Sequence, residues 1–112
     1  MVRGLSTVTD IKMDYDGRVP ADFDQRLALL CHVFRLTPVV VRFDRTRHGY
    51  HCIVTVRRRL APWRIIVAQL ALGSDWKREL FNSRRVTAWR NVPSFWRERW
   101  NVLYSRHYRS KV

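Results

Sequence analysis

Apolar and polar residues alternate along residues 39–56, which predicts two β-strands joined by a short turn at His48-Gly49. Neighbouring residues of a strand point to opposite faces, so one face of this hairpin is apolar and the other is mixed. We expect Val39, Val41, Phe43, Cys52, Val54 and Val56 to face the core. The opposite face then carries Arg42, Asp44, His51 and Thr55.

The same alternation over residues 7–16 predicts a first strand, with Ile11, Met13 and Tyr15 on its apolar side. Apolar residues then recur at i, i+3 and i+4 spacing, which predicts an amphipathic helix that begins after Pro20 and ends near Arg35. The chain therefore enters the hairpin from a helix.

Two further helices are predicted after the hairpin, over residues 62–72 and 75–86. Gly73 is a typical C-terminal residue for the first of them, and Ser74 is a typical N-cap for the second. Residues 101–104, NVLY, are predicted to form a short last strand.

The predicted order of elements is βαββαβ, with the helical part of the second half divided in two. This order is typical of an α+β, ferredoxin-like or RRM-like fold, in which helices cover one face of an antiparallel sheet. The 112 residues suffice for one hydrophobic core. We expect a single nucleic-acid-binding domain over residues 1–112, with residues 105–112 as a basic tail.

Positive charge dominates the composition. Lys and Arg number 22 against 9 Asp and Glu, a net charge of +13, and the isoelectric point is about 11.3. A chain this basic attracts polyanions, so we expect nucleic acid as the partner, with DNA favoured over RNA. The alternative is an ordinary solvated surface or a scaffold role.

Other classes of protein fit the composition poorly. Two cysteines without a CxxC pair argue against a zinc module or a disulfide scaffold. No apolar run approaches the ~20 residues of a membrane span, and no signal-peptide pattern opens the chain. We therefore expect a cytoplasmic protein of whatever cell hosts it, without a membrane partner.

Basic side chains recur at the hairpin turn, after the second hairpin strand and along the C-terminal third, where they alternate with tryptophans. Such a pattern is typical of a groove that follows a phosphate backbone and stacks bases on aromatic rings. The candidate nucleic-acid contacts are Arg42, Arg45, Arg47, His48, His51, Arg57, Arg58, Arg59, Arg84, Arg85 and Arg90.

Asp14 and Asp16 form a D-x-D pair on the first predicted strand. Residues i and i+2 of a strand lie on one side about 7 Å apart, so both carboxylates could reach Mg²⁺ or Mn²⁺. His51 on a neighbouring strand could contact a phosphate or nucleotide. These three residues are the candidate catalytic site, with Asp14 and Asp16 as metal ligands; a solvated surface is the alternative.

The segments IKMDYDG, residues 11–17, and VVVRFDRTRHGYHCIV, residues 39–54, resemble the archaeo-eukaryotic primase superfamily. There a D-x-D strand is followed by a helix and by a strand pair with an S-G-x-G-x-H type segment. The resemblance implies metal ligation by Asp14 and Asp16 and nucleotide contact by His51. The chain departs from the pattern at Arg47-His48, which replaces Ser-Gly, and lacks an evident third carboxylate on a later strand.

The chain is also similar to small proteins of phages and archaeal viruses, in which a G-Y-H strand precedes a helix pair with L-G-x-D-x-x-R, here residues 72–78. This similarity implies a replication accessory of a virus or mobile element. Two alternatives remain open: a minimal metal-dependent primase-like nucleotidyltransferase or nuclease, and a small protein that docks on a host polymerase or another protein. A homodimer through an unpaired sheet edge is also among the expectations.

Overall fold

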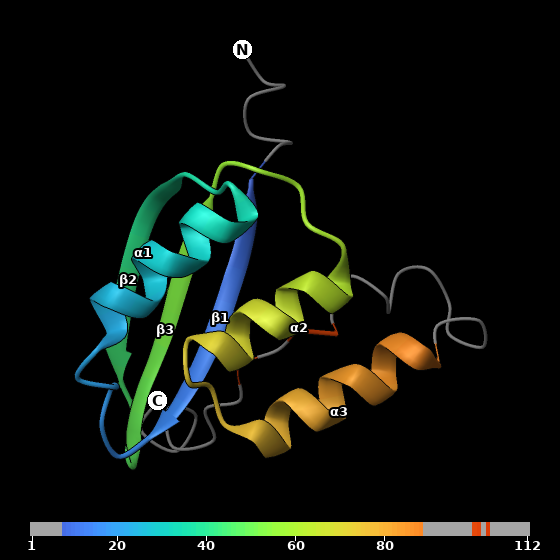
Figure 1. Ribbon diagram of the computed structural model, residues 1–112. Coiled ribbons are helices and arrows are strands. Elements are labelled where there is room, and N and C mark those ends of the chain that lie inside the picture. The colour runs from blue at the N-terminus through green and yellow to red at the C-terminus, as the bar shows by residue number, and fades with distance from the viewer. Residues whose placement is uncertain (1–7, 89–99, 102, 104–112) are drawn as a thin grey trace.

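Three antiparallel strands form the sheet: β1 (Thr9–Asp16), β3 (Gly49–Val56) and β2 (Pro38–Arg45), in the order β1-β3-β2 (Figure 1). The computed structural model describes residues 8–88, 100, 101 and 103. The hairpin of β2 and β3 lies where the alternating pattern predicts it, and β3 is the central strand.

Three helices complete the described part of the chain: α1 (Phe23–Phe34), α2 (Pro62–Ala71) and α3 (Trp76–Thr87). Helices α1 and α2 lie over one face of the sheet, and α3 runs beside α2 (Figure 1). The predicted α+β class is confirmed, and the order of elements is consistent with a ferredoxin-like arrangement. None of these helices is long and apolar enough to cross a membrane.

The predicted fourth strand falls mainly outside the described residues. Asn101 lies in a bend and Leu103 has no regular secondary structure, whereas Val102 and Tyr104 are outside the described part. The sheet as described therefore has three strands.

The core lies between the sheet and the helices. The side chains predicted to face inward on β1 and β3 are buried, and helix α1 contributes Phe23 and Leu30. The buried strand residues are Ile11, Met13, Tyr15, Cys52, Val54 and Val56.

Strand β2 differs from the prediction. Val39, Val41 and Phe43 are expected in the core, yet they are 46%, 41% and 42% exposed. Both β1 and β2 are edge strands among the described residues, but α2 and α3 lie on the β1 side of the sheet, away from β2 (Figure 1). Phe43 meets the ring of Phe23 edge-on at a centroid distance of 5.1 Å, which is the ring contact of this strand with α1.

The turn between β2 and β3 depends on Gly49. The Thr46 amide donates to the Gly49 carbonyl, and the Gly17 amide donates to the His48 carbonyl, so β1 ends against the turn. A Cβ atom at Gly49 would lie 1.8 Å from the Tyr15 carbonyl oxygen. Only glycine allows this close approach of two backbones.

The outer edge of β1 is closed by hydrogen bonds from the helical half of the chain. The Lys12 amide donates to Gln69 Oε1 at 2.9 Å, and Arg78 Nη1 donates to the Lys12 carbonyl at 2.8 Å. Both backbone groups of Lys12 that point away from the sheet therefore have partners, although no strand of the described part of the chain pairs there.

Asp14, two residues further along the same edge, is satisfied in the same way. Its amide donates to Ser74 Oγ at 3.1 Å, and its carbonyl accepts from the Asp75 amide at 3.0 Å. Ser74 is thus not the N-cap that the sequence predicts. Asp75 takes that position, and its carboxylate accepts from the Lys77 amide.

Candidate functional site

The carboxylates of Asp14 and Asp16 and the imidazole of His51 line one pocket of about 390 Å³ at the turn end of the sheet. Asp14 lies opposite His51 in the register of β1 and β3, which brings the two side chains together as the sequence predicts. We call this the carboxylate pocket. Its walls are Asp14, Tyr15, Asp16, Thr46, His48, His51 and Asp75.

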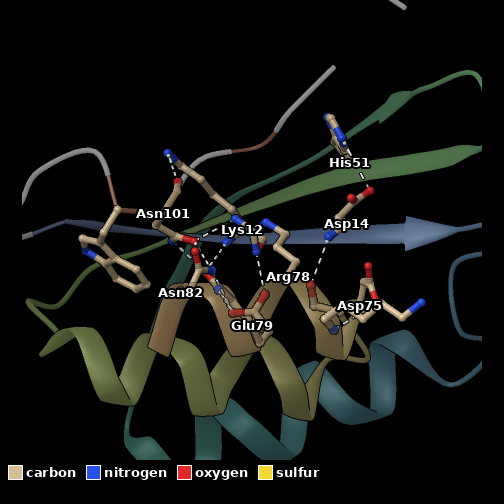
Figure 2. A network of polar contacts seen from close by, with 12 residues as sticks. Lys12, Asp14, His51, Asp75, Arg78, Glu79, Asn82 and Asn101 are labelled. Carbon is tan, nitrogen blue, oxygen red and sulfur yellow. Dashed lines mark hydrogen bonds and ion pairs between the residues drawn. The ribbon is translucent and has the colours of Figure 1, made fainter. Parts of the chain in front are cut away.

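Asp14 and His51 form a close pair within this pocket (Figure 2). His51 Nε2 lies 3.5 Å from Asp14 Oδ1, and the imidazole is buried. Burial raises the pKa of the Asp14 carboxyl above its ordinary value, and the attraction of His51 and Arg78 only partly offsets this. The pocket therefore holds a carboxylate whose charge is unfavourable there.

The carboxylate pocket does not provide a full set of metal ligands. Within residues 8–88, 100, 101 and 103, no three His, Cys, Asp or Glu side chains are grouped so that they could hold a metal ion. The Mg²⁺ or Mn²⁺ site on Asp14 and Asp16 stays a prediction from the sequence.

A buried polar network lies behind β1, on the side of α2 and α3 (Figure 2). Glu79 is 1% exposed and accepts from Arg78, Gln69 and Asn82 at 2.6, 2.6 and 3.1 Å. Arg78 Nη2 also donates to Asn101 Oδ1 at 2.8 Å. These groups satisfy one another and the edge of β1, so the network is structural.

Exposed cations gather at the turn of the hairpin. Arg45, Arg47 and His48 are exposed and line a small polar pocket of about 180 Å³ beside the turn. Arg42 lies further along β2 and pairs with Asp44 at 3.1 Å, so part of its charge is neutralised. The turn brings together three of the predicted contacts.

A second group of cations lies at the opposite end of the sheet, where three exposed residues, Arg57, Arg58 and Arg59, follow the last residue of β3. Arg58 Nη1 donates to the Phe34 carbonyl at 2.6 Å and holds the C-terminal end of α1. It also lines a cleft of about 420 Å³, which we call the arginine–tryptophan cleft. Its walls are Val33, Phe34, Arg35, Arg58, Trp63 and Arg64.

The cleft combines three guanidinium groups with an exposed indole. Trp63 is 58% exposed, and the Arg64 guanidinium lies over its ring at 5.3 Å. Arg35 ends α1 with φ of 56°, in the left-handed region, although glycine is the usual residue there. This left-handed residue ends the helix, and its backbone N–H donates to the Cys31 carbonyl.

The sequence identifies only Arg58 among these cleft residues. Arg35, Trp63 and Arg64 come from two separate pieces of the chain, the end of α1 and the start of α2. The sequence offers one signal for this cleft: Trp63 and Arg64 are adjacent in a helix whose apolar face packs on the core, and they lie outside that face. Their meeting depends on how α1 and α2 pack together.

The remaining predicted contacts are dispersed. Arg84 lies on the exposed side of α3, with its guanidinium 6.0 Å from the Phe81 ring. Arg85 donates to Asn82 Oδ1 and to the Trp100 carbonyl, both at 3.1 Å, and therefore belongs to the structural network. Arg90 lies outside the described residues.

Comparison of the chain with family models, curated proteins and solved structures finds no match. The resemblance to primases and to small viral proteins stays a prediction from the sequence.

Proposed function

We propose that this protein binds single-stranded nucleic acid, with single-stranded DNA as the preferred ligand, in the arginine–tryptophan cleft. One observation carries the proposal: three guanidinium groups and an exposed indole line the same cavity. Arginines contact phosphates with paired N–H donors, and an exposed indole offers a face on which a base can stack.

Charge around the cleft supports the same proposal. Arg57 and Arg59 flank Arg58 and are exposed. A nucleic acid strand bound in the cleft would therefore meet further guanidinium groups beside it. The face of the sheet opposite the helices is a weaker candidate. It carries Asp14, Asp16 and Asp44, whose charges repel phosphates.

The test is fluorescence anisotropy of a labelled single-stranded oligodeoxynucleotide across a salt series. Trp63→Ala is expected to weaken binding by roughly 5- to 150-fold, the loss of one stacked base at about 1–3 kcal/mol. Trp76→Ala is the matched control, because Trp76 is 63% exposed on α3 and lies outside the cleft. This control should bind as the wild type does.

Arg35→Gly separates binding from folding. Glycine adopts the left-handed backbone of residue 35 without strain, so the variant should be at least as stable as the wild type. Loss of one phosphate contact should lower the slope of log K against log salt by about 0.7. Unchanged affinity and slope in both cleft variants, or an equal loss in Trp76→Ala, would refute the assignment of the site.

A further inference from the structure

The two edges of the sheet differ in whether their outward backbone groups have hydrogen-bond partners. On the β1 edge, the outward backbone groups of Lys12 and Asp14 are hydrogen-bonded by residues of the helical half. On the β2 edge, no strand within residues 8–88, 100, 101 and 103 pairs, and Val39, Val40, Val41 and Phe43 are all more than 40% exposed. An open apolar edge of this kind is a template for another strand.

The register of the hairpin identifies the backbone groups that face outward. The Thr46 amide donates to the Gly49 carbonyl, and the Gly49 amide donates to Thr46 Oγ1. These two residues therefore mark a hydrogen-bonded position of the ladder, and such positions alternate along an antiparallel pair. Arg42 and Asp44 therefore direct their N–H and C=O groups to Ile53 and His51 of β3. Val41, Phe43 and Arg45 direct theirs away from the sheet.

We propose that a second copy of this chain pairs with this edge, β2 against β2, in an antiparallel register centred on Phe43. Phe43 then lies opposite its own copy, and Val41 lies opposite Arg45, so the outward groups of all three residues meet in hydrogen-bonded pairs. The two sheets join into one.

Charge selects this register from its neighbours. With Phe43 on the two-fold axis, Arg42 of each copy lies opposite Asp44 of the other, giving two cross-strand pairs of opposite charge. Centring the pairing on Arg42 instead would place two guanidinium groups face to face. Arg42 and Asp44 of one β2 strand thus match Asp44 and Arg42 of a second copy, and a two-fold interface requires such a self-complementary surface.

The apolar side chains and the bulge agree with the same register. Phe43 already contacts Phe23, so two copies would form a continuous row of four aromatic rings on the helical side. The irregularity of β2 falls between Pro38 and Val40, outside the five residues that pair.

The test uses complementary charge reversal, measured by sedimentation velocity on the full chain freed of nucleic acid. Arg42→Asp and Asp44→Arg should each weaken the wild-type dimer about tenfold or more, because both cross-strand pairs become repulsive. An equimolar mixture of the two variants should associate again, since each Asp then meets an Arg. Arg84→Asp, with the same change of charge on α3, is the control and should dimerise normally.

Val41→Pro tests the backbone directly. It removes an outward N–H group but no hydrogen bond to β3, because Val41 and Val54 form a non-hydrogen-bonded pair, and an edge strand tolerates proline there. Circular dichroism should show a folded monomer. A wild-type chain that stays monomeric at high concentration, a dimer that survives Val41→Pro, or a charge-reversed mixture that fails to associate would each overturn the proposal.

Discussion

The backbone of Asp14 stabilises the folded protein, whereas its ionised side chain destabilises it. Its amide and carbonyl bind Ser74 and Asp75 and close the sheet edge. Its carboxylate is half-buried beside His51, and the removal of water from it raises its pKa. The ionised side chain is therefore less favourable in the folded protein than in the unfolded chain.

Asp14→Asn is expected to raise the midpoint of thermal unfolding at pH 7. Because the folded-state pKa exceeds the ordinary value of 3.8, the folded protein binds this proton more readily than the unfolded chain. The contribution of Asp14 to stability is thus most favourable below pH 3.8 and declines as the pH rises through the raised pKa. The advantage of the amide should shrink accordingly as the pH falls from 7 toward 4.

Differential scanning fluorimetry from pH 4 to 7 measures the effect. Asp24→Asn makes the same change of charge at an exposed position in the first turn of α1, so it shows the effect of net charge together with the loss of a small helix-dipole contribution. A lower midpoint for Asp14→Asn at pH 7 would mean that its attraction to His51 outweighs burial, contrary to this account.

Among the elements, α3 stabilises the sheet through polar rather than apolar contacts. Glu79 and Asn82 are its buried residues, and Arg78 reaches the carbonyl of Lys12 on β1. Arg78 of α3 and Gln69 of α2 thus bind the backbone of Lys12 at an edge where no strand of the described residues pairs.

Glu79→Ala is expected to lower the free energy of unfolding by roughly 3–5 kcal/mol, because it leaves the buried guanidinium of Arg78 without its counterion. Glu79→Gln should cost less, since its carbonyl oxygen can still accept from Gln69 and Asn82. Urea unfolding followed by circular dichroism gives both values.

Leu80→Ala is the control for the loss of side-chain bulk, because Leu80 is the next residue of α3 and is 42% exposed. It should change the free energy of unfolding by less than about 1 kcal/mol. If Glu79→Ala costs no more than Leu80→Ala, the network does not stabilise the sheet edge.

The sequence predicts elements with a clear period and fails where burial depends on neighbours. β1, α1, β3 and α2 lie within a few residues of their predicted bounds, since periods of 2.0 and 3.6 report local geometry. Val41 and Phe43 have the same alternation as Cys52 and Val54, yet only the latter two lie on a central strand. Conversely, Glu79 is a charged residue that is 1% exposed, and no periodic pattern predicts its burial.

The two candidate sites also differ in how far the sequence predicts them, because one depends on strand faces and the other on helix packing. Asp14 and His51 could be predicted to meet, because both lie on strands whose faces the alternation defines. The arginine–tryptophan cleft could not, because Arg35, Arg58 and Trp63 come together only through packing of α1, α2 and the segment that follows β3. Alternation along one element carries no information about that packing.

For the whole molecule, the net charge of +13 acts in opposite directions on the two proposed associations. Binding to a nucleic acid strand releases counterions and weakens as salt rises. Association of two copies brings like charges together, and salt screens this repulsion, since the Debye length falls from about 30 Å at 0.01 M to about 8 Å at 0.15 M. The exposed Arg42–Asp44 pairs are also screened, but such pairs contribute little by themselves.

We therefore expect the dimer to tighten between about 0.01 and 0.15 M salt, while affinity for a single-stranded oligonucleotide falls over the same range. Sedimentation velocity and anisotropy on one preparation measure the two trends together. Val41→Pro should stay monomeric at both salt concentrations, which separates pairing of β2 from non-specific association. A dimer that weakens as salt rises would mean that ion pairs, rather than the backbone and Phe43, hold the two copies together.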